Sequence, residues 1–356
     1  MDRLKKLVGD ISPAVKVIEI GALCRPLIDR EKADVFYVDY ADRTFLQARY
    51  RDDPNVDIEK IVETDGVWGD RKLKEVVGTF GPVDAVIASH VAEHVPDLIG
   101  WLCEIGEVLK PNGVIGLAVP DMRFTFDRFR QLSSLTDLLE NHLLRRRIPS
   151  VRQVIDHVIH VQAENTARSV HIGTASTPKA LSVNDLMGVR SLVEDISVCG
   201  SYHDVHCNIF NPLSFATLMH QVVSLDLVRL RCGLFFDTEL NQNEFFVRLQ
   251  KSTTQTEAIE SWKYVLDNLV KNGWIHDARQ LASIDEIGAI SDEDESVTNL
   301  AMNRQFSLGY DQARNEFESA LAANTVLLDQ ILKSRSWRLT RPYRWLGSLL
   351  KPKQHD

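Results

Sequence analysis

Short apolar runs with the character of β-strands alternate with segments of helical period over Val15–Leu249. The strand candidates are VKVIEI, VFYVD, DAVIAS, VIGLAV, VHCNIF, LVRLRCGLFF and EFFVRLQ. Between the early runs, Leu98, Leu102 and Ile105 recur at the spacing of one helix face. Strands that alternate with helices favour parallel βαβ units, so the sequence predicts an α/β fold with a doubly wound sheet.

Two departures from simple alternation shape the predicted architecture. The last two strand candidates are joined only by DTELNQN, which is too short for a crossover helix, so they should pair antiparallel. Between about Met122 and Gly200 the strand signal gives way to helical periodicity rich in arginine. We interpret residues 122–200 as a helical insertion that covers the carboxyl edge of the sheet.

The sequence changes character again after Lys251. TTQTEAIESWKYVLDNLVKNGW predicts a helix, SDEDES a solvated acidic loop, and NRQFSLGYDQARNEFESALAANTVLLDQILKS a long helix. The predicted organisation is a sheet domain at residues 1–251, an α-helical extension with an acidic loop at 252–332, and a basic and aromatic tail at 333–356.

Composition and charge narrow the class of protein. The chain has 356 residues and a net charge of -9, so the whole molecule is not built to coat nucleic acid. Its five cysteines include no CxxC pair, which favours reduced thiols. The start, MDRLKKLVGDISP, lacks the apolar run of a secretion signal, and no run of about 18 apolar residues is present. These features predict a cytoplasmic protein.

The first strand candidate ends in a turn with a single glycine, within VKVIEIGALCRPLIDREKADVFYVDYAD. Pro26 has no amide hydrogen and the residues before it are bulky, so the turn is a poor cradle for a diphosphate. What remains is Glu19 on the strand, Gly21 in the turn and Asp39 at the end of the second strand. An acid at that end can accept hydrogen bonds from both hydroxyls of a ribose. A core β-α unit with an incidental glycine is the alternative.

This arrangement resembles the cofactor-binding region of class I S-adenosylmethionine-dependent methyltransferases. A second block, DAVIASHVAEHVPDLIGWLCEIGEVLKPNGVIGLAVPD, is very similar to the methyltransferase pattern D-x-V-x-x-x-H-V-x-E-H-x-x-D … L-x-P-G-G, with Asn112 in place of the first paired glycine. The resemblance covers about residues 10–251. It implies a Rossmann-like, seven-stranded sheet with an antiparallel last strand, and S-adenosylmethionine as the cofactor.

The resemblance also implies roles for particular residues. Gly21 would let the methionine part of the cofactor lie against the backbone, and Glu19 would orient that loop or the amino group. Asp39 would bind the ribose. Asp65, in IVETDGVW, would lie near the adenine amino group.

Ser89 and His90 follow the strand DAVIAS and would line the cleft beside the sulfonium. For Glu93 and His94, one turn later, helix capping or a structural hydrogen bond is as good an interpretation as chemistry.

Two histidine clusters are available for the acceptor side. IDHVIH carries Asp156, His157 and His160, whereas SYHDVHCNIF carries Asp204 and His206. If the second cluster is a strand, Asp204 and His206 lie on one face, where the carboxylate can orient the imidazole. We therefore predict Asp204 and His206 as catalytic residues, with His206 as base or substrate ligand. A structural hydrogen bond is the alternative.

PDMRFTFDRFR follows the strand VIGLAV, at the edge where substrate should enter. We predict Asp121 and Arg123 as substrate-binding residues, with surface ion pairs in a helix as the alternative. No metal is predicted, because metal-dependent O-methyltransferases usually carry carboxylates beside the fourth strand and DAVIASH ends without one.

The tail from Lys333 to Lys353 carries seven basic side chains and no acid, with Trp337, Tyr343 and Trp345 between them. Such a composition suits nucleic acid or an anionic membrane surface, and we predict peripheral contact with the inner face of the membrane rather than nucleic acid. SRSWRLTRPYRWLGSLL resembles a tail of enzymes that assemble bacterial surface polysaccharides.

The predicted function is therefore methylation of a hydroxyl on a saccharide or lipid-linked glycan. One alternative is a methyltransferase for small molecules or natural products, with the tail as a device for homo-oligomerisation. Another is a non-catalytic, cofactor-binding subunit of a glycan-assembly complex.

Overall fold

A computed structural model describes most of the predicted sheet domain and the helix after it. The described residues are 2–10, 12–69, 71–161, 183–199 and 202–271. The predicted acidic loop, long helix and basic tail lie outside the described residues.

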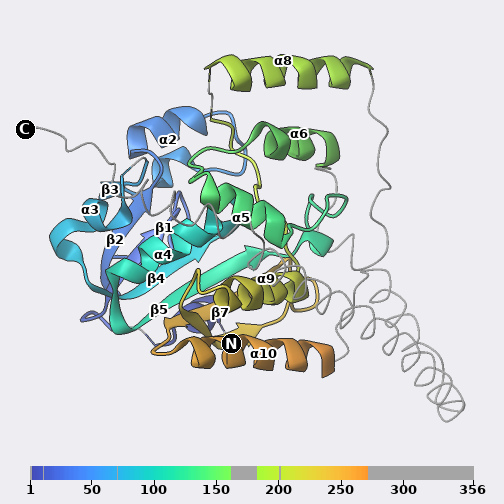
Figure 1. Ribbon diagram of the computed structural model, residues 1–356. Helices are drawn as coiled ribbons and strands as arrows, with labels where there is room; N and C mark the ends of the chain where they lie inside the picture. The colour runs from blue at the N-terminus through green and yellow to red at the C-terminus, as the bar shows by residue number, and fades with distance from the viewer. Residues whose placement is uncertain (1, 11, 70, 162–182, 200–201, 272–356) are drawn as a thin grey trace, which may run out of the picture. The chain divides into compact units, whose positions relative to one another are not determined.

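The described part is built on a sheet of seven strands in the order β3-β2-β1-β4-β5-β7-β6 (Figure 1). The strands are β1 (Lys16–Ile20), β2 (Asp34–Asp39), β3 (Gly66–Val67), β4 (Val83–Ser89), β5 (Leu109–Pro120), β6 (Leu230–Phe236) and β7 (Glu244–Lys251). The first five are parallel to one another, whereas β7 lies antiparallel between β5 and β6. This confirms the predicted Rossmann-like α/β sheet and its antiparallel last strand.

Helices connect the strands and also form the insertion. The α-helices are α1 (Arg3–Leu7), α2 (Arg43–Arg49), α3 (Leu73–Val77), α4 (Leu98–Val108), α5 (Leu135–Leu143), α6 (Val151–His160), α8 (Val183–Cys199), α9 (Pro212–Ser224) and α10 (Gln255–Lys271). The 3-10 turns are η1 (Ile58–Lys60), η2 (Gly78–Phe80), η3 (Ala92–His94) and η4 (Met122–Phe124). The helices α5, α6 and α8 form the predicted insertion after β5.

One predicted strand is wrong. VHCNIF, residues 205–210, has no regular secondary structure, and the seventh strand is β3, which lies inside IVETDGVW. The side chains of VHCNIF are buried throughout, so its apolar character reflects packing and not strand pairing. The strand β3 has two residues, which is too short to produce an alternating pattern.

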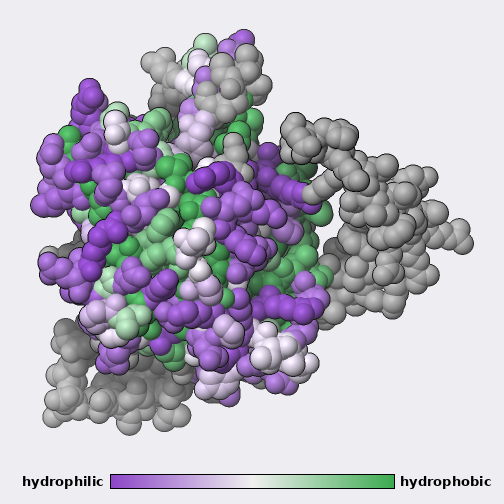
Figure 2. All heavy atoms as spheres, turned by 90° about the vertical axis from the view of Figure 1, so that its left-hand side faces the viewer, coloured by the Kyte–Doolittle hydropathy of each residue, from purple (hydrophilic) through white to green (hydrophobic). Residues whose placement is uncertain are grey.

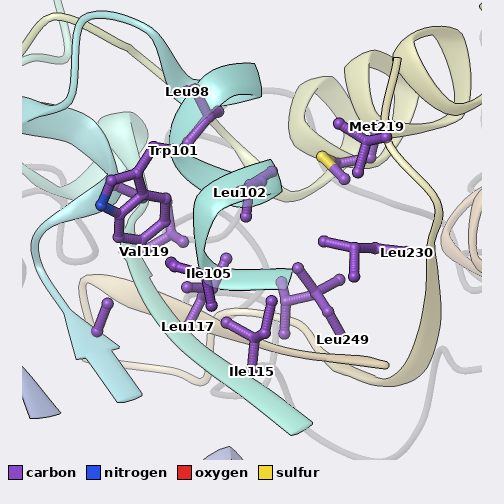
Figure 3. Close-up of a cluster of buried hydrophobic side chains, with 14 of the residues drawn as sticks. Leu98, Trp101, Leu102, Ile105, Ile115, Leu117, Val119, Met219, Leu230 and Leu249 are labelled. Atoms are coloured by element: carbon purple, nitrogen blue, oxygen red, sulfur yellow. The ribbon is translucent and has the colours of Figure 1, made fainter. Parts of the chain in front are cut away.

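Apolar side chains cover both faces of the sheet because successive strand residues point to opposite sides. On one face, α4, α9 and α10 pack on the strands, and Figure 3 shows Ile105 of α4 pointing toward Leu117 of β5. On the other face, Leu7 of α1 packs with Val17 and Phe246. A Cβ at Gly116 would lie 2.7 Å from the carbonyl oxygen of Leu7, so glycine is needed for this close approach.

The helix α10 is part of the folded core beside β6. Trp262 is fully buried, and its indole Nε1 donates a hydrogen bond to the carbonyl oxygen of Leu230 at 3.0 Å. Among the described helices, none is long and apolar enough to cross a membrane. Figure 2 shows one face of the molecule, where hydrophilic residues predominate and hydrophobic ones lie between them.

We expect Trp262→Ala to lower the free energy of unfolding by about 3–5 kcal/mol, because it leaves a cavity and an unpaired carbonyl at Leu230. Chemical denaturation measures this change. The matched control is Lys263→Ala on the exposed side of the same helix, where the ion pair with Asp267 should contribute less than about 1 kcal/mol. Equal stabilities of the two variants would show that α10 is not part of the cooperative core.

Candidate active site

Glu19, on β1, organises the loop that follows the strand. Its carboxylate accepts hydrogen bonds from the amides of Leu27 at 2.7 Å and Ile28 at 3.1 Å. Burial raises the pKa of Glu19 to about 7 in spite of these two bonds. Glu19 therefore orients the loop between Gly21 and Ile28, and a contact with the cofactor stays a prediction.

Gly21 brings the turn after β1 against the turn after β4. Its φ of +69° lies in the left-handed region, and a Cβ at this position would lie 2.6 Å from Cγ2 of Val91. Its amide donates to the carbonyl oxygen of Val38 at 2.9 Å. A side chain at this position would separate the two turns, so the close approach requires glycine.

Asp39 ends β2 at the same edge of the sheet. Its Oδ1 accepts a hydrogen bond from the amide of Tyr40 at 2.8 Å. Burial, together with the negative charge of Asp204, raises the pKa of Asp39 to about 6. A partly buried carboxylate of this kind gains when a ligand supplies hydrogen-bond donors, as the ribose hydroxyls would.

Asp65 lies before β3, where other groups engage its carboxylate. Its Oδ2 accepts one hydrogen bond from the amide of Tyr37 and one from the guanidinium of Arg30, each at 2.8 Å. These contacts tie Asp65 to β2, and its predicted approach to an adenine stays a prediction.

Ser89 and His90, at the end of β4, contact an ion pair that the sequence analysis missed. Arg3 donates to Glu244 at 2.6 and 2.8 Å and to the hydroxyl oxygen of Ser89 at 2.7 Å. Nε2 of His90 lies 3.0 Å from the same carboxylate of Glu244. Burial opposes protonation of His90, but the carboxylates of Glu244 and Glu93 raise its pKa. The first helix and the last strand thus meet beside β4.

His206 pairs with Asp127, and the predicted pairing of His206 with Asp204 is wrong. Nδ1 of His206 lies 2.5 Å from Oδ2 of Asp127. The other carboxylate oxygen of Asp127 accepts a hydrogen bond from Arg130 at 2.9 Å. Burial would raise the pKa of Asp127, but His206 and Arg130 hold it below its usual range. The reason for the error is that VHCNIF is irregular, so Asp204 and His206 do not share a strand face.

Asp204 instead contacts His94 and Tyr50. Its Oδ1 lies 2.8 Å from Nδ1 of His94, and its Oδ2 accepts from the hydroxyl of Tyr50 at 3.0 Å. Burial would raise the pKa of Asp204, but the contacts with His94 and Tyr50 hold it below its usual range. Burial likewise opposes protonation of His94, yet Asp204 and Glu93 raise its pKa to about 9.

Glu93, whose role the sequence left open, lies at the centre of these histidines. Its Oε1 is 3.5 Å from Nδ1 of His90, 3.9 Å from Nε2 of His94 and 4.0 Å from Nε2 of His206. We call Glu93, His90, His94 and His206 the histidine–glutamate cluster. Within the described part of the chain, neither carboxylate oxygen of Glu93 has a hydrogen-bond partner, although the residue is fully buried.

The histidines of IDHVIH approach this cluster from α6. Burial and the nearby Arg130 guanidinium lower the pKa of His157 to about 4, so this imidazole is neutral near pH 7. Asp156 accepts a hydrogen bond from Arg130 at 2.8 Å, and His160 lies 2.9 Å from the other oxygen of Asp156. Asp156 and His160 therefore form contacts within the insertion, and the three residues of α6 are not members of the histidine–glutamate cluster.

Asp121 and Arg123, after β5, bind each other. The guanidinium of Arg123 donates to both carboxylate oxygens of Asp121, at 2.6 Å in the shortest contact, and Thr238 donates to Asp121 at 2.7 Å. Both residues are buried. A role in substrate binding stays a prediction for this pair.

The strand order, the glycine turn after β1 and the acid at the end of β2 define an S-adenosylmethionine-dependent methyltransferase fold. A family model described as a methyltransferase domain matches residues 18–222, which is more than half of the chain. The chain belongs to this methyltransferase family, and its cofactor is S-adenosylmethionine. No curated protein matches the sequence at a significant level.

Several solved structures are similar in fold. One, titled a putative Zn-dependent alcohol dehydrogenase from Rhodobacter sphaeroides, is 13% identical with a TM-score of 0.39, over 71% of this chain and 91% of the other. A SAM-dependent methyltransferase from Aquifex aeolicus is 8% identical with a TM-score of 0.29, over 70% and 94%. The trans-methyltransferase CalH, in complex with SAH, is 15% identical with a TM-score of 0.32, over 68% and 52%. Likenesses this distant carry no argument about the acceptor.

We expect the affinity for S-adenosylmethionine to fall as the pH drops below about 6, because a protonated Asp39 cannot accept from both ribose hydroxyls. The loss should approach about tenfold per pH unit. Asp39→Ala should cost about 1.5–3 kcal/mol of binding free energy at neutral pH. Calorimetry measures both effects, with the exposed Glu63→Gln as a control. Unchanged affinity of Asp39→Ala would contradict the assignment of the ribose site.

The same carboxylate should destabilise the cofactor-free protein. Because the pKa of Asp39 is raised from 3.8 to about 6, ionisation favours unfolding, and the penalty is absent below pH 3.8 and complete above pH 6. Asp39→Asn should therefore raise the free energy of unfolding by about 1–2 kcal/mol at pH 8. Denaturant titrations at pH 8 and pH 4 test this, since the gain should vanish at the lower pH.

Proposed function

We propose that this methyltransferase transfers the methyl group of S-adenosylmethionine to a hydroxyl of a small molecule, and that the acceptor is a saccharide or lipid-linked glycan. The observation that carries the proposal is the buried pair of His206 and Asp127. It faces the turn after β4 that carries Ser89 and His90, the residues predicted to lie beside the sulfonium.

Transfer to a hydroxyl needs both alignment and loss of a proton. The reaction is an in-line displacement at the methyl carbon, so the oxygen must lie opposite the sulfur. An alcohol has a pKa far above 7 and needs activation, whereas an amine or thiol needs less help. A polar, histidine-rich site is therefore better suited to an oxygen acceptor.

The arrangement around His206 provides such activation. Asp127 engages Nδ1 of His206, which leaves Nε2 directed at Glu93, 4.0 Å away. Nδ1 of His90 lies 3.5 Å from the same oxygen of Glu93. The group proposed for the acceptor and the group proposed for the sulfonium side thus lie near one carboxylate.

The saccharide part of the proposal is supported by the sequence of the tail, which lies outside the described residues. Its basic and aromatic residues suit a lipid-linked, anionic acceptor at a membrane surface. A screen of nucleotide sugars, lipid-linked glycans and aromatic small molecules, with methylated products detected by mass spectrometry, tests the acceptor class. Methylation of the aromatic set alone would leave the alternative of natural-product methylation.

We expect His206→Asn to lower turnover by about 10²-fold or more while the affinity for S-adenosylmethionine stays unchanged. Asp127→Asn should lower turnover in the same direction, because the imidazole loses the partner that orients it. His220→Asn, which removes an imidazole of α9 outside the histidine–glutamate cluster, is the control. Full turnover of His206→Asn would reduce His206 to a structural residue.

We expect truncation before Ser334 to abolish sedimentation with anionic vesicles at low salt and to leave cofactor affinity unchanged. Each basic group near an anionic surface contributes about 1 kcal/mol, and the truncation removes six of the seven in the tail. Added salt should release the full-length protein because it screens these charges. If the full-length protein does not sediment even at low salt, the membrane part of the proposal is wrong.

A further inference from the structure

The carboxylate of Glu93 is buried in a way that calls for a cation. Its side chain is 1% exposed, and neither of its oxygens has a hydrogen-bond partner among the residues that the structure describes. A buried carboxylate without hydrogen bonds is strongly disfavoured unless a positive charge, from protonated imidazoles or from a metal ion, balances it. The shortest of its described ion pairs is with Nδ1 of His90 at 3.5 Å, which is too long for a charge-assisted hydrogen bond of about 2.7–2.9 Å.

The imidazoles around Glu93 are held in the manner of metal ligands. Nδ1 of His206 is hydrogen-bonded to Asp127, and Nδ1 of His94 lies 2.8 Å from Oδ1 of Asp204. Nε2 of each ring lies near the same oxygen of Glu93, at 3.9 Å for His94 and 4.0 Å for His206. A carboxylate on one ring nitrogen fixes the orientation of the ring and leaves the other nitrogen for an ion. Two such pairs around one buried carboxylate form a ligand set.

We propose that Glu93, His94 and His206 bind a divalent transition-metal ion such as Zn²⁺ or Mn²⁺. Their ligand atoms all lie within 4.8 Å of one another. Two atoms that each lie about 2.1 Å from one ion are about 3–4 Å apart, which is close to the 3.9 and 4.0 Å between Glu93 and the two rings. Two imidazoles and one carboxylate suit this class of metal and leave coordination positions open.

The charges of the site agree with an added cation. Asp127 faces the guanidinium of Arg130, whereas the described ion pairs of Glu93 and Asp204 are with histidines. An ion of charge +2 would balance these two carboxylates with the imidazoles neutral. The side chain of His94 is 30% exposed, which gives the ion a path from solvent.

This site differs from the expectation that no metal is bound. That expectation rested on the lack of a carboxylate at the end of DAVIASH, but η3 turns the chain so that Glu93 lies beside His90 again. Sequence spacing did not reveal the third ligand, because His206 reaches the site from beyond the insertion.

The ion would also deepen the proposed function, on which this part of the inference rests. An acceptor hydroxyl bound in an open position would lose its proton to water more readily, because the ion stabilises the alkoxide. The oxygen would then take the methyl group from the sulfonium, and S-adenosylhomocysteine would leave. His206 would activate the acceptor by holding the ion rather than by taking the proton itself.

The test is metal binding by tag-free, full-length protein after chelator treatment and dialysis, without cofactor or acceptor. Titration with Zn²⁺ should give one tight site per chain, and Co²⁺ should gain the visible absorption of nitrogen and oxygen coordination. Glu93→Gln and His206→Asn should each weaken Zn²⁺ binding at least about 100-fold, and Asp127→Asn about 10–100-fold. His220→Asn, outside the cluster, should bind as the wild type does. Far-ultraviolet circular dichroism checks that each variant is folded.

Two outcomes would overturn the metal site: no stoichiometric Zn²⁺ binding by the wild type, or equal binding by folded Glu93→Gln and His220→Asn. Turnover separates this inference from the proposed function. Methylation that survives chelation, together with the absence of Zn²⁺ binding, overturns the metal site alone. Zn²⁺ binding that depends on Glu93, in a protein that methylates no hydroxyl, supports the metal site and overturns the proposed acceptor.

Discussion

The backbone carbonyl of Glu93 determines how the site is assembled. It accepts hydrogen bonds from the amides of Cys207 at 2.6 Å and Asn208 at 2.9 Å, so the segment that returns from the insertion is fixed against the turn after β4. The side chain of Asn208 adds bonds to the carbonyl oxygens of Ala92 and Val95 at 3.2 and 2.6 Å. Because these groups are buried, breaking the contact would leave several polar atoms unpaired, at a cost of about 1–3 kcal/mol each. The same contact brings His206 opposite the carboxylate of Glu93.

The sequence was sufficient to predict the sheet but not the side-chain pairs between distant segments. Short continuous apolar runs indicate strands that are buried on both faces of a sheet, and β1, β4, β5 and β7 carry that signal clearly. VHCNIF carries a similar signal because an irregular segment pressed between a turn and a helix is equally buried. The assumed strand put Asp204 beside His206, whereas the true partner, Asp127, is 79 residues away in sequence. Local spacing holds no information about such a contact.

Two acids on neighbouring strands, the buried Glu19 and the partly buried Asp39, have similar pKa shifts but different hydrogen-bond partners. Glu19 and Asp39 both have a raised pKa that burial explains. Glu19 accepts hydrogen bonds from two amides of its own loop, so its carboxylate already has partners within the fold. Asp39 has one described backbone donor, from Tyr40, and retains capacity for more. A satisfied acid stabilises a loop, whereas an acid with spare acceptor capacity at a strand end is the better candidate for ligand binding.

The backbone at His90 explains why three members of the cluster come from one short segment. His90 has a φ of 53°, in the left-handed region, which is strained for a residue with a side chain. Its amide remains bonded to the carbonyl oxygen of Ala118 on β5 at 2.9 Å, so β4 is extended to the last point before the chain reverses. The reversal into η3 then places Glu93 and His94 beside His90, where a continued strand would have carried them away from the sheet edge. Strain retained at such a point is typical of functional sites, and here it brings His90, Glu93 and His94 together at the carboxyl edge of the sheet.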